Sequence, residues 1–464
     1  MISVKEYYRP KLIFMQLVML MILYNLHCYI LVPNLRLIVE YFGTTYAYAG
    51  TLLGAYIFLS GFASLLWALY SDIKGAKRKA LITLGIFACG IFTLFASIIE
   101  NMYLFALFYI LAGMFIAVVN PFSITIIVDT FKSHERTEKL MLLSVLGGIG
   151  LGLSFVISLI TMAYYESWRL SLLITSLINL LFGVPLAISL LEPPKGLSEE
   201  ELHDVLIQVK SYPFALRRED LQLIIGNTTN KYVVLQGIFG TLANGALQVW
   251  LLQYLVIEVG MSETAASIFL GLSSVAAIGG ILIAKLADIL YKRSPKARPI
   301  IAAICSFLEG VFFIIFFILP IKAEITTFDF IEAAMDLLSL MSSSPILILS
   351  AISFSIAMLF NSSVGSIRDS VLSDVNLPEH RATVISGTDI IELFMKSISS
   401  AVIGTIIYIT GSIKYPLIAF MLFWFLSGYY WIYVAQYISQ DIRRIKNILQ
   451  ERREKILKLI KIQF

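Results

Sequence analysis

The stretch Glu192-Pro-Pro-Lys-Gly-Leu-Ser-Glu-Glu-Glu-Leu202 opens the one long polar interval, residues 192–231, of an otherwise apolar chain. Its two prolines and its glycine are residues that end helices, so the apolar helix before it is expected to stop here. Ser198 and Glu201 have the spacing of a capping box, in which the two side chains accept hydrogen bonds from free backbone N–H groups at a helix start. Apolar residues at helical spacing then predict an amphipathic helix suited to lie against a membrane surface: Leu202, Val205, Leu206 and Val209.

The composition is that of a polytopic helical membrane protein. Of the 464 residues, 58% are hydrophobic and 14% are charged, and the mean hydropathy is +0.85. That is enough apolar sequence for roughly a dozen membrane spans of about 20 residues each. Apolar runs bounded by charged or turn residues lie, six on each side of the polar interval, at about 12–36, 46–70, 80–99, 102–128, 140–164, 169–191, 232–258, 264–290, 300–320, 345–372, 383–409 and 416–437.

These runs predict an all-α fold of twelve transmembrane helices in two pseudo-symmetric halves. The predicted parts are an N-terminal half, a cytoplasmic linker, a C-terminal half and a basic amphipathic tail, at residues 1–191, 192–231, 232–437 and 438–464. The first run lacks a small-residue cleavage site and is therefore expected to be a retained span. The three cysteines lie in apolar segments without metal-ligand spacing and are expected to serve packing: Cys28, Cys89 and Cys305.

Basic residues are concentrated in every second connection between the spans. Three such connections carry Lys74, Lys77, Arg78 and Lys79, then Lys132, Arg136 and Lys139, and then Lys292, Arg293, Lys296 and Arg298. The alternate connections hold mainly acidic residues, among them Glu100, Glu166 and Glu263. Because cytoplasmic loops are enriched in Lys and Arg, both termini and the linker are predicted to be cytoplasmic in a protein of the cell membrane.

Charged residues also repeat between the halves. Asp72 and Asp288 each end the second span of their half, and each is followed by a basic turn. Such an internal repeat is typical of transporter folds that hold a site near the membrane midplane between the halves. Two further acid–base pairs, each seven residues apart, follow the fourth and the tenth spans: Asp129 with Arg136, and Asp374 with Arg381.

Two segments depart from this symmetry. The external interval 321–344 carries four acidic residues and is interpreted as containing a short surface helix. The tail 438–464 mixes many bases with Ile and Leu at helical spacing, which is typical of an amphipathic helix on the anionic inner leaflet of a membrane. The predicted partners of the tail are therefore membrane lipids, and a nucleic-acid partner is not expected.

The sequence from Ala68 to Arg78, Ala-Leu-Tyr-Ser-Asp-Ile-Lys-Gly-Ala-Lys-Arg, resembles the signature that the major facilitator superfamily carries between its second and third spans. That signature is Gly-x-x-x-Asp-Arg-x-Gly-Arg-Arg/Lys. Three positions match it: Asp72, Gly75 and Lys77. Three others replace its first glycine and two arginines: Ala68, Ile73 and Ala76. The motif follows the second of twelve runs and is echoed at Asp288, so the resemblance covers essentially the whole chain.

Within that superfamily the chain is most similar to the Spinster-like lipid transporters. Trp168-Arg169 and Glu192-Pro-Pro-Lys-Gly196, on either side of the sixth span, are similar to their Trp-Arg…Glu-Pro-Pro-Arg-Gly pattern. The family's Asp-Arg pair in the first helix is replaced by His27-Cys28, and its Gly-x-Gly-Glu in the fourth helix is replaced by Gly113-Met-Phe-Ile116. The resemblance therefore implies the fold, but not proton coupling or a lipid substrate.

The matched motif and the acid–base repeat supply the residues of a predicted cytoplasmic gate: Asp72, Gly75, Lys77, Arg136, Asp288 and Arg381. The resemblance implies that Asp72 caps or pairs across the cytoplasmic contact between the halves. A carboxylate that lies near helix N-termini and arginine side chains in a buried, low-dielectric interface forms ion pairs and hydrogen bonds that can break reversibly. The alternative is a solvated loop acid that only ends a helix.

The run 383–409 holds three ionisable residues on one helical face: Asp389, Glu392 and Lys396. Measured from Thr383, a rise of about 1.5 Å per residue puts them at depths of about 9, 14 and 20 Å. Ionisable groups at such depth face a bundle interior or a watery cavity. If they are functional, an acid carries a proton or Lys396 meets an anionic substrate. The alternative is a Glu392–Lys396 pair that only fixes the packing.

The uncharged candidates for a substrate cavity lie in three other spans: His27 in the first, Asn120 in the fourth, and Asn244 and Gln248 in the seventh. An imidazole can titrate or can hydrogen-bond a substrate. Interhelical hydrogen bonds are the alternative for these polar groups. Glu309 is deep in the ninth span, but that helix is peripheral in the facilitator fold, so Glu309 is not predicted as a site residue.

The sequence contains no phosphate-binding glycine loop, no metal-ligand cluster and no nucleophile–base arrangement, so an ATP-driven pump is disfavoured and no cofactor or metal is predicted. The first hypothesis is a secondary transporter that moves a small organic or amphipathic, lipid-like solute by alternating access, coupled to protons or another ion. The alternatives are a transporter-like membrane sensor or scaffold that moves nothing, and a uniporter without proton coupling. A membrane-embedded enzyme comes third.

Overall fold

A computed structural model of the chain describes residues 9–209, 211–327 and 329–463. In these residues the secondary structure is helical, apart from one isolated bridge between Met261 and Ile325. Twelve of the described helical segments are long and apolar enough to span a membrane. The predicted all-α fold with twelve spans is therefore confirmed.

The helices group into two compact units. The first comprises the chain up to Gly226, the segment Leu372–Ile390 and the chain from Arg443 onward, and the second comprises Asn227–Val371 and Ile391–Ile442. Two segments that follow the linker in sequence therefore pack with the N-terminal half. The predicted limits of the halves, the linker and the tail stay predictions.

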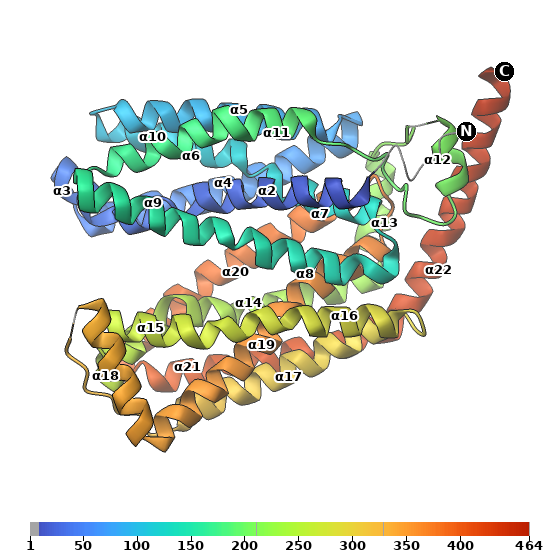
Figure 1. Ribbon diagram of the computed structural model, residues 1–464. Helices are drawn as coiled ribbons and strands as arrows, with labels where there is room; N and C mark the ends of the chain where they lie inside the picture. Colours follow the sequence, from blue (N-terminus) through green and yellow to red (C-terminus); the bar gives the residue numbers. More distant parts are fainter. Residues whose placement is uncertain (1–8, 210, 328, 464) are drawn as a thin grey trace. The chain divides into compact units, whose positions relative to one another are not determined.

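The first unit contains six spans, which can be followed from blue to green in Figure 1. In chain order they are α2 (Pro10–Tyr29), α4 (Tyr46–Lys74), α5 (Arg78–Ile98), α6 with α7 (Met102–Ile116, Val119–Thr130), α8 with α9 (Arg136–Gly147, Ile149–Tyr165) and α10 with α11 (Trp168–Ile178, Val184–Ser189). Shorter helices are α3 (Leu35–Phe42), α12 (His203–Val209) and α13 (Leu221–Gly226).

Breaks within these spans have local causes. Pro121 lacks the N–H that would bond to the carbonyl of Ala117, and the helix is interrupted there, between α6 and α7. Gly150, in the first turn of α9, lies directly against the backbone of α2, where an added Cβ would collide with the carbonyl oxygen of Ile22. Glycine at this position therefore permits the close approach of α2 and α9.

The second unit contains the remaining spans. They are α14 (Thr228–Tyr254), α15 with α16 (Glu263–Ser274, Gly280–Tyr291), α17 (Ala297–Ile318), most of α19 (Pro345–Asp374) and of α20 (Arg381–Thr410), α21 (Lys414–Met421) and the first part of α22 (Phe423–Gln463). Between α17 and α19 lies α18 (Phe330–Ser343), which confirms the predicted short helix in the acidic interval. The Asp329 carboxylate starts α18, because it accepts from the backbone N–H groups of Ile331 and Glu332.

The linker helix begins later than predicted. Helix α12 starts at His203, because the predicted capping residues have other partners. The Ser198 hydroxyl donates to the backbone oxygen of Val128 at 2.6 Å, and the Glu201 carboxylate pairs with Lys446 at 3.0 Å. The predicted capping box is therefore wrong.

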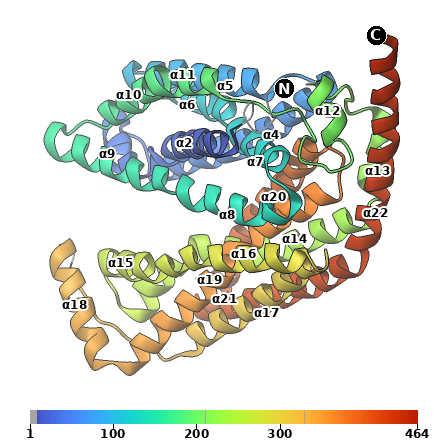
Figure 2. The same ribbon diagram turned by 45° about the vertical axis from the view of Figure 1, so that its right-hand side comes forward.

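The apolar face of the linker helix is buried inside the first unit. Leu202, Val205 and Leu206 are completely buried and pack with Leu377 and with the α22 residues Ile445, Leu449 and Ile456. Figure 2 shows α12 beside the terminal part of α22. The prediction that this face lies on a membrane surface is wrong, because α22 carries an apolar stripe of its own and the two stripes cover each other.

Candidate functional site

Buried ion pairs connect the linker to the ends of α4, α5, α7, α8, α19 and α20 in the first unit. We call this cluster the linker network; its members are Asp72, Arg78, Asp129, Arg136, Glu192, Lys195, Glu199, Asp374 and Arg381. Its three arginines are among the largest fully buried side chains of the protein. A buried guanidinium without a partner is strongly unfavourable, so each arginine requires carboxylates within hydrogen-bonding distance.

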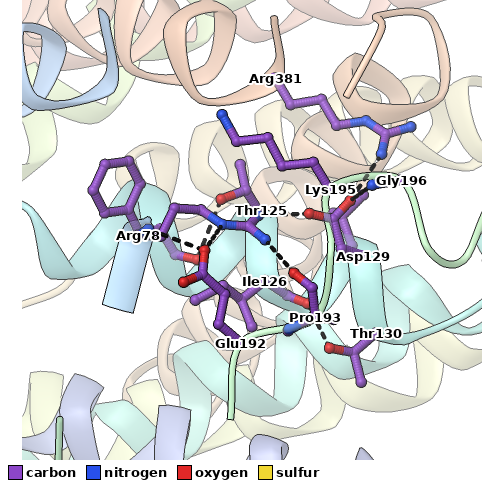
Figure 3. Close-up of polar contacts among 12 residues, drawn as sticks. Arg78, Thr125, Ile126, Asp129, Thr130, Glu192, Pro193, Lys195, Gly196 and Arg381 are labelled. Carbon is purple, nitrogen blue, oxygen red and sulfur yellow. Dashed lines mark hydrogen bonds and ion pairs between the residues drawn. The ribbon is translucent and has the colours of Figure 1, made fainter. Parts of the chain in front are cut away.

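Arg78, the first residue of α5, binds two carboxylates (Figure 3). Its Nη1 lies 2.5 Å from Asp129 Oδ2, its Nε lies 3.1 Å from Glu192 Oε1, and its Nη2 donates to the Pro193 oxygen at 3.0 Å. The Glu192 carboxylate also accepts from the backbone N–H groups of Arg78 and Lys79 at 3.0 and 3.2 Å. A negative charge stabilises a helix N-terminus, so Glu192 holds the start of the linker on the start of α5.

The two repeated acid–base pairs exchange partners. Asp129, near the end of α7, accepts from Arg381 Nη1 at 3.3 Å, and Asp374, the last residue of α19, accepts from Arg136 Nη1 at 2.8 Å. The acid of each repeat thus binds the arginine of the other repeat, which lies 252 or 238 residues away in sequence. Both pairs lie within the first unit, because that unit includes Leu372–Ile390.

Glu199 of the linker joins the two exchanged pairs. Its Oε1 accepts from Arg136 Nη2 at 2.7 Å and from Arg381 Nη2 at 2.5 Å. Burial by itself would raise the pKa of Glu199, but the charges of the two guanidinium groups and their hydrogen bonds outweigh burial and lower the pKa to about 2. Glu199 is therefore a permanent anion between two buried cations at physiological pH.

Asp72 lies beside the start of α20. Its Oδ2 accepts from the backbone N–H and the hydroxyl of Thr383 at 2.9 and 2.8 Å, and its Oδ1 accepts from Lys195 Nζ at 2.7 Å. The carboxylate thus satisfies a free donor in the first turn of α20 and neutralises a linker lysine. The structure brings Asp72 into the same network as the predicted gate residues Arg136 and Arg381.

The other predicted gate residues lie outside the network as the structure describes it. Gly75 ends α4 with a φ of 63°, a left-handed conformation that glycine adopts without steric penalty. Lys77 is exposed, whereas the adjacent Arg78 is buried. Asp288 lies in the second unit, where it accepts from Arg298 Nη2 at 2.6 Å.

The second unit contains a polar pocket of about 260 Å³ between α14, α19, α20 and α22. Asn244 and Glu392, two of the predicted candidates, line the pocket together with Gln236, Asn361 and Arg368. Arg368 forms an ion pair with Glu392, and Asn361 Nδ2 donates to Asn244 Oδ1 at 3.0 Å. Amides and an ion pair that converge on a cavity in an apolar bundle are suited to hold a polar solute.

The three ionisable residues of α20 have different surroundings. Asp389 belongs to the first unit, whereas Glu392 and Lys396 belong to the second. Glu392 forms an ion pair with Arg368 of α19. Lys396 is half-buried, and its backbone lies against Gly245 of α14.

The remaining candidates lie apart from one another. His27 is completely buried in the first unit, its ring stacks on Tyr109 with 5.6 Å between centroids, and its Nδ1 lies 3.4 Å from Thr93 Oγ1. Asn120 is half-buried in α7, and Gln248 is exposed on α14. As described, the structure places none of the three in the linker network or among the residues that line the pocket.

Several site residues were missed in the sequence. Glu199 stands in an acidic run that the capping interpretation assigns to a helix start, and its partners Arg136 and Arg381 lie 63 and 182 residues away in the sequence, so no local pattern pointed to it. Lys77 matches the family motif, but Arg78 beside it is the buried base. Asn361 is an isolated amide in an apolar run, and the sequence shows no partner for it.

Comparison with known proteins is consistent with this geometry. Residues 17–388 match the family model of the Major Facilitator Superfamily. The sphingosine-1-phosphate transporter SPNS2 of Danio rerio is 24% identical over 262 residues, which are 53% of this chain and 51% of the relative. Protein spinster homolog 1 of Xenopus laevis is 26% identical over 282 residues, which are 57% and 52% of the two chains. The chain thus spans about half the length of the curated relatives it matches.

Solved structures of sugar symporters share the fold at low sequence identity. The proton:xylose symporter XylE, bound to 6-bromo-6-deoxy-D-glucose, has a TM-score of 0.61 at 14% identity over 94% of this chain and 96% of that chain. The E. coli fucose:proton symporter FucP has a TM-score of 0.65 at 15% identity over 91% and 98% of the two chains.

Proposed function

The chain belongs to the major facilitator superfamily, and on that premise we propose that it is a secondary active transporter that moves a small organic or amphipathic, lipid-like solute by alternating access. As a member of this family it is an integral membrane transporter of small molecules and not an enzyme. A lipid-like solute is supported by its similarity to SPNS2, which is named as a sphingosine-1-phosphate transporter.

The observation that carries the proposal is the exchange of partners around Glu199. The acid of each sequence half binds the arginine of the other half, and the linker acid holds both arginines. Breaking these bonds would remove the buried ion pairs that tie Asp374 and Arg381 of the segment 372–390 to the rest of the first unit. Desolvation offsets much of the attraction in a buried ion pair, so such a network can open without unfolding the helices. We therefore assign the linker network as the gate that forms and breaks during transport.

The proposal also assigns an orientation and a lipid contact. The linker, both termini and the linker network are assigned to the cytoplasmic side, on the basis of the bases in alternate connections. Helix α22 carries exposed bases opposite its buried apolar stripe, among them Arg443, Arg444 and Lys455. We assign these bases to the anionic inner leaflet.

Uptake into liposomes tests the proposal. Purified protein is reconstituted, and entry of labelled sphingosine-1-phosphate, xylose and fucose is measured with and without a pH gradient, against protein-free liposomes. We expect one class of solute to enter, with a slower rate for Arg136→Gln and an unchanged rate for Lys77→Gln, the exposed control.

The alternatives have distinct outcomes in the same assay. Entry that ignores the pH gradient would favour a uniporter or coupling to another ion. Folded protein that binds a solute but moves none would favour the sensor or scaffold and would refute transport.

A further inference from the structure

Glu309 is a buried carboxyl of the second unit that neither the linker network nor the pocket lining includes. It lies in the middle of α17 and is completely inaccessible to solvent. Its Oε1 accepts a hydrogen bond from Asn361 Nδ2, whereas Oε2 has no hydrogen-bond partner among the residues that the structure describes. An ionised carboxylate in such a place has a large desolvation penalty and only one amide to offset it.

Among the residues that the structure describes, no cationic side chain forms an ion pair with Glu309. On its own helix the neighbouring titratable group is Cys305, which accepts from the Ser363 hydroxyl at 3.7 Å. The pocket charges, Arg368 of α19 and Glu392 of α20, are paired with each other, and α20 also carries the half-buried Lys396. Helices α14 and α22 contribute uncharged side chains to this region, Asn244 and Trp424. A buried carboxyl that lacks a cationic partner keeps its place in a bundle at lowest energy when it holds a proton.

Asn361 connects this carboxyl to the pocket. Its Nδ2 donates both to Glu309 Oε1 and to Asn244 Oδ1, and Asn361 and Asn244 both line the pocket. A side-chain amide has a donor end and an acceptor end. Toward an ionised Glu309 it must present its NH₂ group, and toward a protonated Glu309 it can present its oxygen. Gain or loss of a proton by Glu309 therefore changes how strongly Oε1 holds the Asn361 amide, which is the same amide that a solute in the pocket would meet.

We propose that Glu309 is a proton-binding residue of this transporter and that Asn361 couples its protonation to the solute in the pocket. The proposal deepens the proposed function and rests on it. The step moves a proton from a hydronium ion in the pocket to Glu309 Oε2, forms the O–H bond of a neutral carboxyl, and leaves a water molecule.

Infrared difference spectroscopy of the purified full chain tests proton binding without a transported solute. Spectra are compared between about pH 5 and about pH 9, where the C=O band of a protonated carboxyl is distinct from carboxylate bands. We expect a pH-dependent band in the wild type that is absent in Glu309→Gln and present in Glu263→Gln, the control for an exposed acid in α15. Asn361→Ala should move the band to the higher frequency of a carboxyl with fewer hydrogen bonds, and Glu309→Asp should retain a shifted band if Glu309→Gln fails to fold.

Two results would overturn proton binding: a Glu309→Gln spectrum identical to the wild type, or a band that does not change with pH. Coupling is tested by adding sphingosine-1-phosphate, xylose or fucose to the same sample, and we expect the transported probe to alter the band. Coupling would be overturned, while transport stands, by the following pair of results. A probe enters liposomes without altering the infrared band of the wild type, and its uptake by Glu309→Gln still responds to a pH gradient. If no probe enters, the proposed function and the coupling fail together, whereas the band still decides proton binding by Glu309.

Discussion

Replacing Glu199 with glutamine removes one negative charge from the linker and keeps the size of the side chain. This carboxylate binds the fully buried guanidinium groups of Arg136 and Arg381 at 2.7 and 2.5 Å. Its pKa is lowered from the ordinary 4.5 to about 2, and since each tenfold change in proton affinity is about 1.4 kcal/mol, the ionised form is stabilised by about 3 kcal/mol. The variant leaves two buried cations one anion short, so we expect its free energy of unfolding to fall by about that amount.

The pH dependence of this contribution has a defined sign. Because the folded pKa of Glu199 lies below the unfolded value of 4.5, the unfolded state binds the proton more readily. The stabilisation is therefore complete above about pH 4.5 and is lost as the pH falls toward about pH 2. The difference in stability between wild type and Glu199→Gln should be largest near neutral pH.

Thermal unfolding in detergent and hydrogen exchange of the segment 375–380 would measure the effect. The matched control is Glu201→Gln, because Glu201 pairs with Lys446, which is 48% exposed, and exposed pairs contribute about 0–1 kcal/mol. We expect a clear decrease in Tm and faster exchange for Glu199→Gln, and values near those of the wild type for Glu201→Gln. Equal Tm values for the two variants, with unchanged exchange, would refute the reasoning.

Two further predictions concern packing and acid sensitivity. Gly150→Ala puts a methyl group against the Ile22 carbonyl, whereas nothing lies within 4 Å of a Cβ at Gly152. We expect Gly150→Ala to lower the free energy of unfolding by about 1–3 kcal/mol and to lower the yield of monodisperse protein on gel filtration, and we expect neither effect for Gly152→Ala. Equal yields of the two variants would contradict this packing. Burial lowers the pKa of His380 despite the carboxylates near it, so the unfolded state binds its proton first and stability should fall as the pH decreases below about 6.5. His380→Gln should flatten that part of the curve of Tm against pH, and an unchanged slope would exclude His380 as its source.

The spans were predictable because each is a continuous apolar run, and membrane thickness fixes the length of such a run. Predicted and observed limits differ by a few residues in most spans; the second, for example, is predicted at 46–70 and found at Tyr48–Lys74. The surface helix α18 was predictable from its charges, because an acidic stretch between two spans has to remain in water.

The exchange of ion pairs could not be read from spacing. The sequence shows two acids, each seven residues before an arginine, but whether each acid binds its own arginine or that of the other repeat depends on how the chain folds back. The same limit applies to the linker. The apolar stripe of α12 was visible, but its cover, the stripe of Leu449 and its neighbours, lies more than 200 residues later. Glu309 was visible as a deep acid, but only the structure supplies Asn361 as its partner.

The exchanged pairs also constrain how such a chain can be recombined. Asp129 and Arg136 are encoded in the first half of the gene, and each has one partner that is encoded in the second half, Arg381 and Asp374 respectively. A chimera that joins one half of this protein to the other half of a relative therefore inherits matched charges only if that relative places the same acid and base at both positions. A substitution that reverses the charge of one of these residues is expected to be better tolerated when its partner in the other half is reversed as well, so the two halves are expected to evolve together at these sites.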